Sequence, residues 1–96
     1  MSDEGFEWDP DKAEANLRKH RIDFQAAQRV FDDVFAHLEY DASEDHGEDR
    51  WIAIGLVCGL LIAVVYTERG DRIRIISARK ANSYEQRKYD RDKASF

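Results

Sequence analysis

Basic side chains recur at short intervals after Gly70, in a stretch rich in β-branched residues. Arg72 and Arg74 flank an isoleucine, and Arg79-Lys80 follow after four uncharged residues. Because side chains alternate along a strand, an expected strand over 72–78 puts Arg72, Arg74 and Lys80 on one face and Arg79 on the other. Two guanidinium groups side by side form a site for an anion such as a phosphate. The alternative is an edge strand that its charges protect against aggregation.

Residues that could transfer protons lie near both ends of this segment and earlier in the chain. Glu68 precedes the turn, Lys80 ends the strand, and His20 follows two other basic residues. Attack of a ribose 2′-hydroxyl on the adjacent phosphate needs a base, cations around the phosphorus and an acid for the leaving 5′-oxygen. These residues and the arginines supply such groups without a metal ion. For His20, the alternative is an imidazolium that stabilises a helix C-terminus.

The sequence contains no pattern that indicates a bound metal or cofactor. Neither His37 nor His46 has a second possible metal ligand at helical spacing together with an evident third ligand. His46 falls in an acidic segment, where we expect it to be solvated. There is no glycine-rich phosphate loop. The single cysteine, Cys58, lies between apolar segments and is expected to be a small buried hydrophobic residue.

Charge is distributed unevenly along the chain, whose formal net charge is −5. Residues 1–68 hold six Lys or Arg against sixteen Asp or Glu, whereas residues 69–96 hold nine against four. Such asymmetry can indicate a polyanion-binding face on an acidic body. A solvated, charged C-terminal helix explains the basic segment equally well.

Length and composition indicate one folded domain. Ninety-six residues, 43% of them hydrophobic, suffice for a single core over 1–96, with frayed ends expected at 1–5 and 92–96. One cysteine and no leader-like segment favour a reducing cytoplasm. The seventeen uncharged residues from Trp51 to Thr67 reach the lower limit of a membrane span, but their β-branched residues and glycines favour two buried strands.

Local signals predict an α+β fold with the order β-α-α-β-β-β-β-α. Asp9-Pro10 suit the cap and first position of a helix that runs to about His20, with Ala13 and Leu17 on the same face as His20. Asp23 begins a second helix, and Ser83 caps the last one. The second helix is predicted over 24–32. The other predicted elements are strands at 6–8, 34–40, 51–57, 60–67 and 72–78, and a loop at 41–49. We expect an antiparallel sheet with the helices on one side.

The apolar residues of the second helix recur at helical intervals, which predicts that they face the core. These residues are Phe24, Ala27, Val30, Phe31 and Val34.

Several blocks of the sequence resemble the BrnT family of type II toxins. They are Phe6-Glu7-Trp8-Asp9-Pro10, Asn16-Leu17-x-Lys19-His20, Val30-Phe31-Asp32-Asp33, Arg50-Trp51 and Thr67-Glu68-Arg69-Gly70-Asp71-Arg72-Ile73-Arg74-Ile75-Ile76-Ser77-Ala78-Arg79-Lys80-Ala81. The resemblance extends from Phe6 to about Tyr89. Two positions depart from the family pattern: Arg21 stands where glycine usually ends the first helix, and the turn at Cys58-Gly59 is short and apolar.

The resemblance implies a RelE-like fold and a metal-independent endoribonuclease that inhibits translation and growth. It implies a BrnA-type antitoxin with a ribbon-helix-helix domain, in a 2:2 heterotetramer that contacts operator DNA only through the antitoxin. The catalytic candidates that it carries over are His20, Glu68, Arg72, Arg74, Arg79 and Lys80. The RNA-binding candidates are Lys19, Arg69, Arg72, Arg87 and Lys88. The alternative is an inactive co-repressor that only binds its antitoxin.

Overall fold

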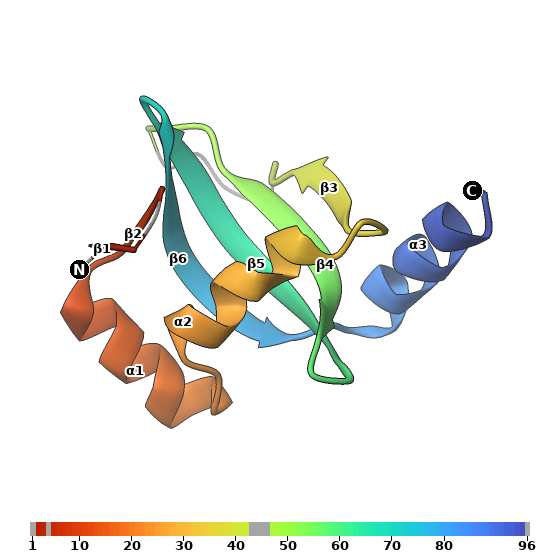
Figure 1. The fold of residues 1–96 in the computed structure, drawn as a ribbon, viewed down its shortest axis with the longest axis horizontal. Coiled ribbons are helices and arrows are strands. Elements are labelled where there is room, and N and C mark those ends of the chain that lie inside the picture. The colour runs from red at the N-terminus through yellow and green to blue at the C-terminus, as the bar shows by residue number, and fades with distance from the viewer. Residues whose placement is uncertain (1, 4, 43–46, 96) are drawn as a thin grey trace.

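The computed structural model describes residues 2–3, 5–42 and 47–95. Within these residues the chain forms six strands, three α-helices and one 3-10 helix (Figure 1). In chain order they are β1 (Ser2–Asp3), β2 (Phe6–Glu7), α1 (Pro10–His20), α2 (Phe24–Ala27), η1 (Gln28–Asp32), β3 (His37–Tyr40), β4 (Trp51–Val57), β5 (Leu60–Arg69), β6 (Arg72–Lys80) and α3 (Ser83–Ala94). The α+β class is confirmed.

The strands form one sheet in the order β1-β2-β6-β5-β4-β3. Strands β3 to β6 pair in chain order and antiparallel, as expected of an antiparallel sheet. Strand β2, however, runs parallel to β6, with Phe6 opposite Ile73 and Glu7 opposite Arg74. The prediction of a wholly antiparallel sheet is therefore wrong. A hairpin forces neighbouring strands to be antiparallel, whereas β2 and β6 are joined by most of the chain and are free of that constraint.

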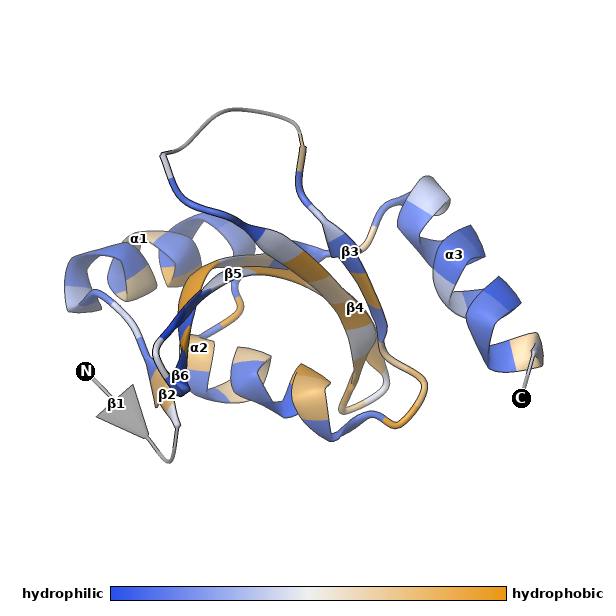
Figure 2. Cartoon of the chain, turned by 90° about the horizontal axis from the view of Figure 1, so that it is seen from above, coloured by the Kyte–Doolittle hydropathy of each residue, from blue (hydrophilic) through white to orange (hydrophobic). Residues whose placement is uncertain are grey.

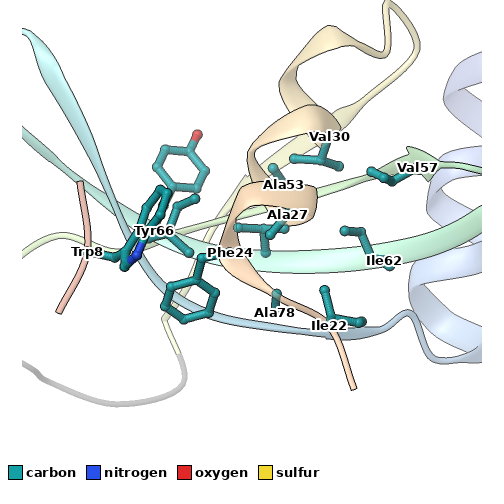
Figure 3. Close-up of a cluster of buried hydrophobic side chains, with 12 residues drawn as sticks. Trp8, Ile22, Phe24, Ala27, Val30, Ala53, Val57, Ile62, Tyr66 and Ala78 are labelled. Carbon is teal, nitrogen blue, oxygen red and sulfur yellow. The ribbon is translucent and has the colours of Figure 1, made fainter. Parts of the chain in front are cut away.

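The sheet is curved, and helices cover both of its faces. Helix α2 lies in the concave face and α3 lies on the convex side (Figure 2). The main core fills the concave side, where Trp8, Phe24, Val30 and Ile62 are all buried (Figure 3). A smaller cluster of Ile54, Ala63 and Tyr89 lies under α3. The prediction that all helices lie on one side of the sheet is thus wrong. Strands β4 and β5 are apolar on both faces, so both faces must be covered.

Helix α1 begins as predicted, with the Asp9 side chain accepting from the Asp11 N–H at 2.9 Å. Its buried residue is Asn16, whereas Leu17 is 45% exposed. The Asn16 amide donates to the carbonyls of Ile22 and Ala78 and accepts from the Ala78 N–H, at 2.9 to 3.1 Å. The helix therefore packs along the edge of β6 that β2 leaves open, and a polar side chain satisfies the unpaired backbone there.

The predicted helix 24–32 is divided into α2 and the 3-10 helix η1. Phe24, Ala27 and Val30 are buried as expected, but Val34 is 79% exposed. The Asp33 carboxylate accepts from the Phe35 and Leu56 N–H groups at 2.9 Å each, which turns the chain out of the helix before residue 34. Strand β3 consequently begins at His37 and is shorter than predicted.

The uncharged run Trp51–Thr67 forms β4 and most of β5, as predicted. Cys58 and Gly59 connect them with positive φ angles of 50° and 81°, which suits a two-residue hairpin turn. Cys58 is exposed, so the prediction of a buried thiol is wrong. No helix among the described residues is both long enough and apolar enough to cross a membrane.

Candidate functional site

A β-bulge in β6 decides which basic residues share a face. Tyr66 pairs with Ile75 and Val65 pairs with Ser77, so Ile76 is an extra residue with no partner in β5. A bulge reverses the alternation of side chains beyond it. Arg79, opposite Ala63, therefore lies on the convex face.

Before the bulge, Arg74 lies opposite Thr67 and Arg72 lies opposite Arg69, also on the convex face. Lys80 lies opposite Ile62, a residue of the concave core. The predicted assignment of side chains to the two faces of the sheet is wrong for both Arg79 and Lys80, because strict alternation assumes a strand without a bulge. The structure thus gives one convex face with Arg72, Arg74 and Arg79, and leaves Lys80 on the other.

Four arginines gather around two carboxylates at the β5–β6 hairpin end of this face. The Glu7 carboxylate lies 2.8 Å from Arg74 Nη1 and 3.6 Å from Arg72 Nε. The Glu48 carboxylate lies 3.5 Å from Arg50 Nη2 and 3.7 Å from Arg69 Nη2. Because Arg69 and Arg72 are cross-strand partners, the arginines around Glu7 lie next to the arginines around Glu48. We call Arg50, Arg69, Arg72 and Arg74 the arginine cluster.

Rigid elements position the arginine cluster. Arg72 donates from Nη2 to the Phe6 carbonyl at 2.9 Å, which ties β2 to β6. Thr67 donates from Oγ1 to the Asp49 carbonyl at 2.6 Å, which holds the segment before β4 and so brings Arg50 to the cluster.

In the arginine cluster, two guanidinium groups are accessible, and the arginines outnumber the carboxylates that they contact. Side-chain exposure is 53% for Arg69 and 38% for Arg72. Like charges directly opposite each other on a sheet repel, so the Arg69–Arg72 pair requires nearby anions. Glu7 and Glu48 supply two negative charges against four positive ones. An added phosphate would find guanidinium groups there that can donate two parallel hydrogen bonds.

Arg79 forms an ion pair with a buried carboxylate outside the arginine cluster. It donates from Nη1 and Nη2 to the Glu85 carboxylate at 2.7 and 2.9 Å, and Glu85 is only 3% exposed. Burial by itself raises the pKa of Glu85, but the Arg79 guanidinium and the Asn82 N–H outweigh it and hold the pKa below its ordinary value. The same contact raises the pKa of Arg79. Arg79 thus anchors α3, whose cap is Asn82 rather than the predicted Ser83.

The three predicted proton-transfer residues lie away from the arginine cluster. Glu68 lies on the concave face, where burial and the negative charge of Glu68 raise the pKa of Tyr66. Lys80 ends β6 on that face. His20 ends α1, which closes at Arg21 in a left-handed conformation with φ of 62°. Arginine therefore adopts the backbone that glycine would favour, and the exposed Lys19 lies beside His20.

The predicted RNA contacts Arg87 and Lys88 lie on the outer face of α3. With Tyr84 and Arg91 they line a hollow of about 310 Å³, and Lys88 Nζ lies 5.2 Å from the centre of the Tyr84 ring. This second basic surface belongs to a helix that contacts β3 and β4. It is therefore separate from the arginine cluster at the β5–β6 hairpin end.

Polar contacts also fasten α3 to the sheet. Tyr89 donates to Asp33 at 2.7 Å, and burial together with that carboxylate raises the pKa of Tyr89 to about 12. His37 Nδ1 pairs with Asp92, which lowers the pKa of Asp92. No group of three His, Cys, Asp or Glu within the described part of the chain could hold a metal ion, and His46 lies outside it.

Sequence reasoning missed Glu7 and Arg50 as site residues. Both occur in the blocks that resemble the BrnT family, yet neither was assigned a role there. The alternation of Phe6, Glu7 and Trp8 could have indicated that Glu7 points away from the core. Its pairing with Arg74 could not be predicted, because no local pattern encodes contact between β2 and β6, which lie far apart in the sequence.

One family model matches the chain over residues 8–85, and its description is ribonuclease toxin, BrnT, of type II toxin-antitoxin system. The matched range runs from Trp8, just before α1, into the first turn of α3 and includes all four residues of the arginine cluster. No curated protein matches the chain. The resemblance inferred from the sequence is confirmed: the chain belongs to the BrnT family of ribonuclease toxins of type II toxin-antitoxin systems.

Proposed function

We propose that this chain is a metal-independent endoribonuclease that cleaves RNA at the arginine cluster and thereby stops translation and growth. The observation that carries this proposal is the convergence of four arginines on two carboxylates, on an accessible face of a rigid sheet. Membership in a family of ribonuclease toxins supplies the class of reaction. The arginine cluster supplies a place where a phosphodiester could bind.

The chemistry follows from the charge of the transition state. When a ribose 2′-oxygen attacks the neighbouring phosphorus, negative charge accumulates on the non-bridging oxygens of the phosphate. Guanidinium groups held in advance stabilise that charge with little reorganisation. Arg69 and Arg72 are accessible, and the Glu48 contacts at 3.5 and 3.7 Å are long enough for a phosphate to displace them. In this proposal Arg72 and Arg74 hold the scissile phosphate, and Arg69 contacts the neighbouring one.

Further contacts extend along the RNA. The basic hollow on α3 supplies Arg87 and Lys88, and Lys19 is an additional exposed cation. These residues have no place in the chemical step in this proposal. We assign Arg79 to the anchoring of α3, because its guanidinium is already engaged by a buried carboxylate. His20, Glu68 and Lys80 lie away from the arginine cluster and take no part in the chemical step in this proposal.

A type II toxin is neutralised by a protein antitoxin, and membership in the family implies such a partner. We propose that it is of the BrnA type, with a ribbon-helix-helix domain, and forms a 2:2 complex with this chain. Its inhibitory segment would cover the arginine cluster and present carboxylates to Arg69 and Arg72. Operator DNA would then contact only the antitoxin, in keeping with the net charge of −5 on this chain.

Expression of the chain in a heterologous bacterium tests this function. Three forms are compared: the natural chain, an Arg72→Ala/Arg74→Ala variant and an Arg18→Ala control. Arg18 is a suitable control because its exposed ion pair with Glu14 lies on α1. The natural chain and the control should arrest growth and fragment total RNA, whereas the double variant should do neither. If the folded natural chain leaves growth and RNA intact, the toxin proposal is wrong and the co-repressor interpretation gains support.

A further inference from the structure

The arginine cluster includes a carboxylate fixed beside its two phosphate-binding candidates. We propose that Glu7 is the general base that takes the proton from the attacking ribose 2′-hydroxyl. This inference rests on the proposed ribonuclease function and names a catalytic residue for it.

Glu7 is held in place by its two neighbours in sequence. Phe6 packs against Phe31, with ring centroids 5.5 Å apart, and Trp8 is 3% exposed in the concave core. Because side chains alternate along β2, these two anchors force Glu7 onto the convex face. Parallel pairing with β6 then sets Glu7 opposite Arg74. The carboxylate therefore sits on a rigid strand and not on a loop.

The contacts of Glu7 place it where a phosphate and its 2′-hydroxyl would lie. Arg74 Nη1 is 2.8 Å from Oε2 and Arg72 Nε is 3.6 Å from Oε1. The Glu7 side chain is 23% exposed, so it is partly accessible from this face. A phosphate that binds these guanidiniums brings its ribose next to the carboxylate. The geometry thus joins a base to the cations that stabilise the phosphorus.

The other candidate bases are less well placed. Glu68 lies on the concave face beside Tyr66, and Lys80 is on that face as well. His20 ends α1, which packs along the edge of β6 at Ala78, four residues beyond Arg74. Glu48 also contacts the arginine cluster, but at 3.5 and 3.7 Å and from a segment before β4. Glu7 has the closest contact to a cluster arginine, at 2.8 Å, among the carboxylates of the described residues.

A Glu7 oxygen accepts the proton of the 2′-hydroxyl, the 2′-oxygen forms a bond to phosphorus, and the bond from phosphorus to the 5′-oxygen breaks. The leaving 5′-oxygen takes a proton from water. The products are a 2′,3′-cyclic phosphate and a 5′-hydroxyl end, and Glu7 returns its proton to solvent. No oxidant, reductant or metal takes part in this step.

The test measures single-turnover cleavage of a short RNA by the purified full chain, in EDTA, for Glu7→Gln and for the natural chain. Glutamine keeps the size of the side chain but cannot accept the proton. We expect the cleavage rate to fall at least about 100-fold, the usual contribution of a general base. Binding of the same RNA with a 2′-deoxy substitution at the cleavage site should stay equal or become tighter, because a negative charge is lost. Retained binding also shows that the variant is folded.

Three further variants make the test specific. Glu7→Asp keeps a base and should recover part of the rate, which a purely structural role for Glu7 would not predict. Glu14→Gln removes an exposed carboxylate on α1 and should leave the rate unchanged. Glu68→Gln tests the competing base. If the natural chain cleaves RNA and Glu7→Gln cleaves at a similar rate, Glu7 is not the base, although the ribonuclease function stands. If the natural chain does not cleave, both proposals fail.

Discussion

Two residues other than glycine adopt a left-handed backbone conformation, which lowers the stability of the folded chain. Arg21 has a φ of 62° and Cys58 a φ of 50°, a region where a Cβ atom crowds the following carbonyl. Replacement with a residue that tolerates this region should stabilise the fold. We expect Arg21→Gly and Cys58→Asn each to raise the free energy of unfolding by about 0.5 to 1 kcal/mol. Urea denaturation measures the change.

The control for this prediction is Glu14→Gly, which introduces glycine within α1, the helix that Arg21 caps. That variant should lose about 1 kcal/mol. A lower stability for Arg21→Gly would mean that contacts of the arginine side chain outweigh its backbone strain.

Asn16 is predicted to be more important for stability than its apolar neighbour Leu17. Asn16→Ala removes three hydrogen bonds and leaves the backbone of Ala78 unpaired, which should cost about 2 to 4 kcal/mol. Leu17 is 45% exposed, so Leu17→Ala should cost less than about 1 kcal/mol. Thermal and urea unfolding of both variants give the comparison. Equal losses would contradict the packing of α1 along the edge of β6.

At the scale of elements, the docking of α3 should depend on pH. The pKa of Glu85 is lower in the folded chain than its ordinary value of 4.5, so the Glu85–Arg79 pair contributes stability above that value. This contribution is lost as the pH falls through the lowered pKa. Asp33 and Asp92 have lowered pKa values as well, and their contacts also hold α3. Circular dichroism between pH 7 and pH 2 should report loss of α3 before the sheet unfolds. Simultaneous loss of α3 and the sheet would contradict this order.

Arg79 should therefore behave as a structural residue. Arg79→Ala leaves the buried carboxylate of Glu85 without its partner and should destabilise the chain by about 3 to 5 kcal/mol. Arg79→Ala/Glu85→Ala, which removes both charges, should recover part of that loss. Chemical denaturation of the two variants provides the measurement. A stability loss below about 1 kcal/mol in Arg79→Ala would show that its contact with Glu85 contributes little.

The sequence predicted those elements whose causes are local. Asp9-Pro10 fixes the start of α1, and the β-branched runs fix the β4–β5 hairpin. The bulge at Ile76, the parallel partner of β2 and the 3-10 turn before Asp33 depend on contacts between distant segments. A local pattern does not encode such contacts. For the same reason, the sequence located Arg72 and Arg74 but missed the carboxylate between them.

At the scale of the whole molecule, an acidic chain presents a basic face. Arg69 ends β5, Arg72 and Arg74 lie near the start of β6, and Arg50 immediately precedes β4. The fold concentrates all four at the β5–β6 hairpin end of the sheet. Charge counted along the sequence indicated a basic C-terminal segment, but the cluster also draws on Arg50, from the acidic part of the chain. The arginine cluster is thus a product of topology as much as of composition.

This arrangement predicts a salt dependence of RNA binding. Each phosphate neutralised by an arginine releases counterions, so affinity for a cleavage-resistant RNA should fall with a logarithmic slope of about −2 to −3. Arg72→Ala/Arg74→Ala should reduce the steepness by about 0.7, because both arginines hold the same phosphate, whereas Arg18→Ala should not change it. Fluorescence anisotropy between 50 and 200 mM salt measures the slope. An unchanged slope in the double variant would place the RNA elsewhere, with the basic hollow on α3 as the next candidate.

The most direct test of the central claim is cleavage of RNA by the purified chain in the presence of EDTA. The natural chain should produce fragments with 2′,3′-cyclic phosphate and 5′-hydroxyl ends, and Arg72→Ala/Arg74→Ala should cleave at least about 100-fold more slowly while it keeps its circular dichroism spectrum. Equal cleavage by the folded double variant, or none by the natural chain, would contradict the assignment of ribonuclease activity to the arginine cluster.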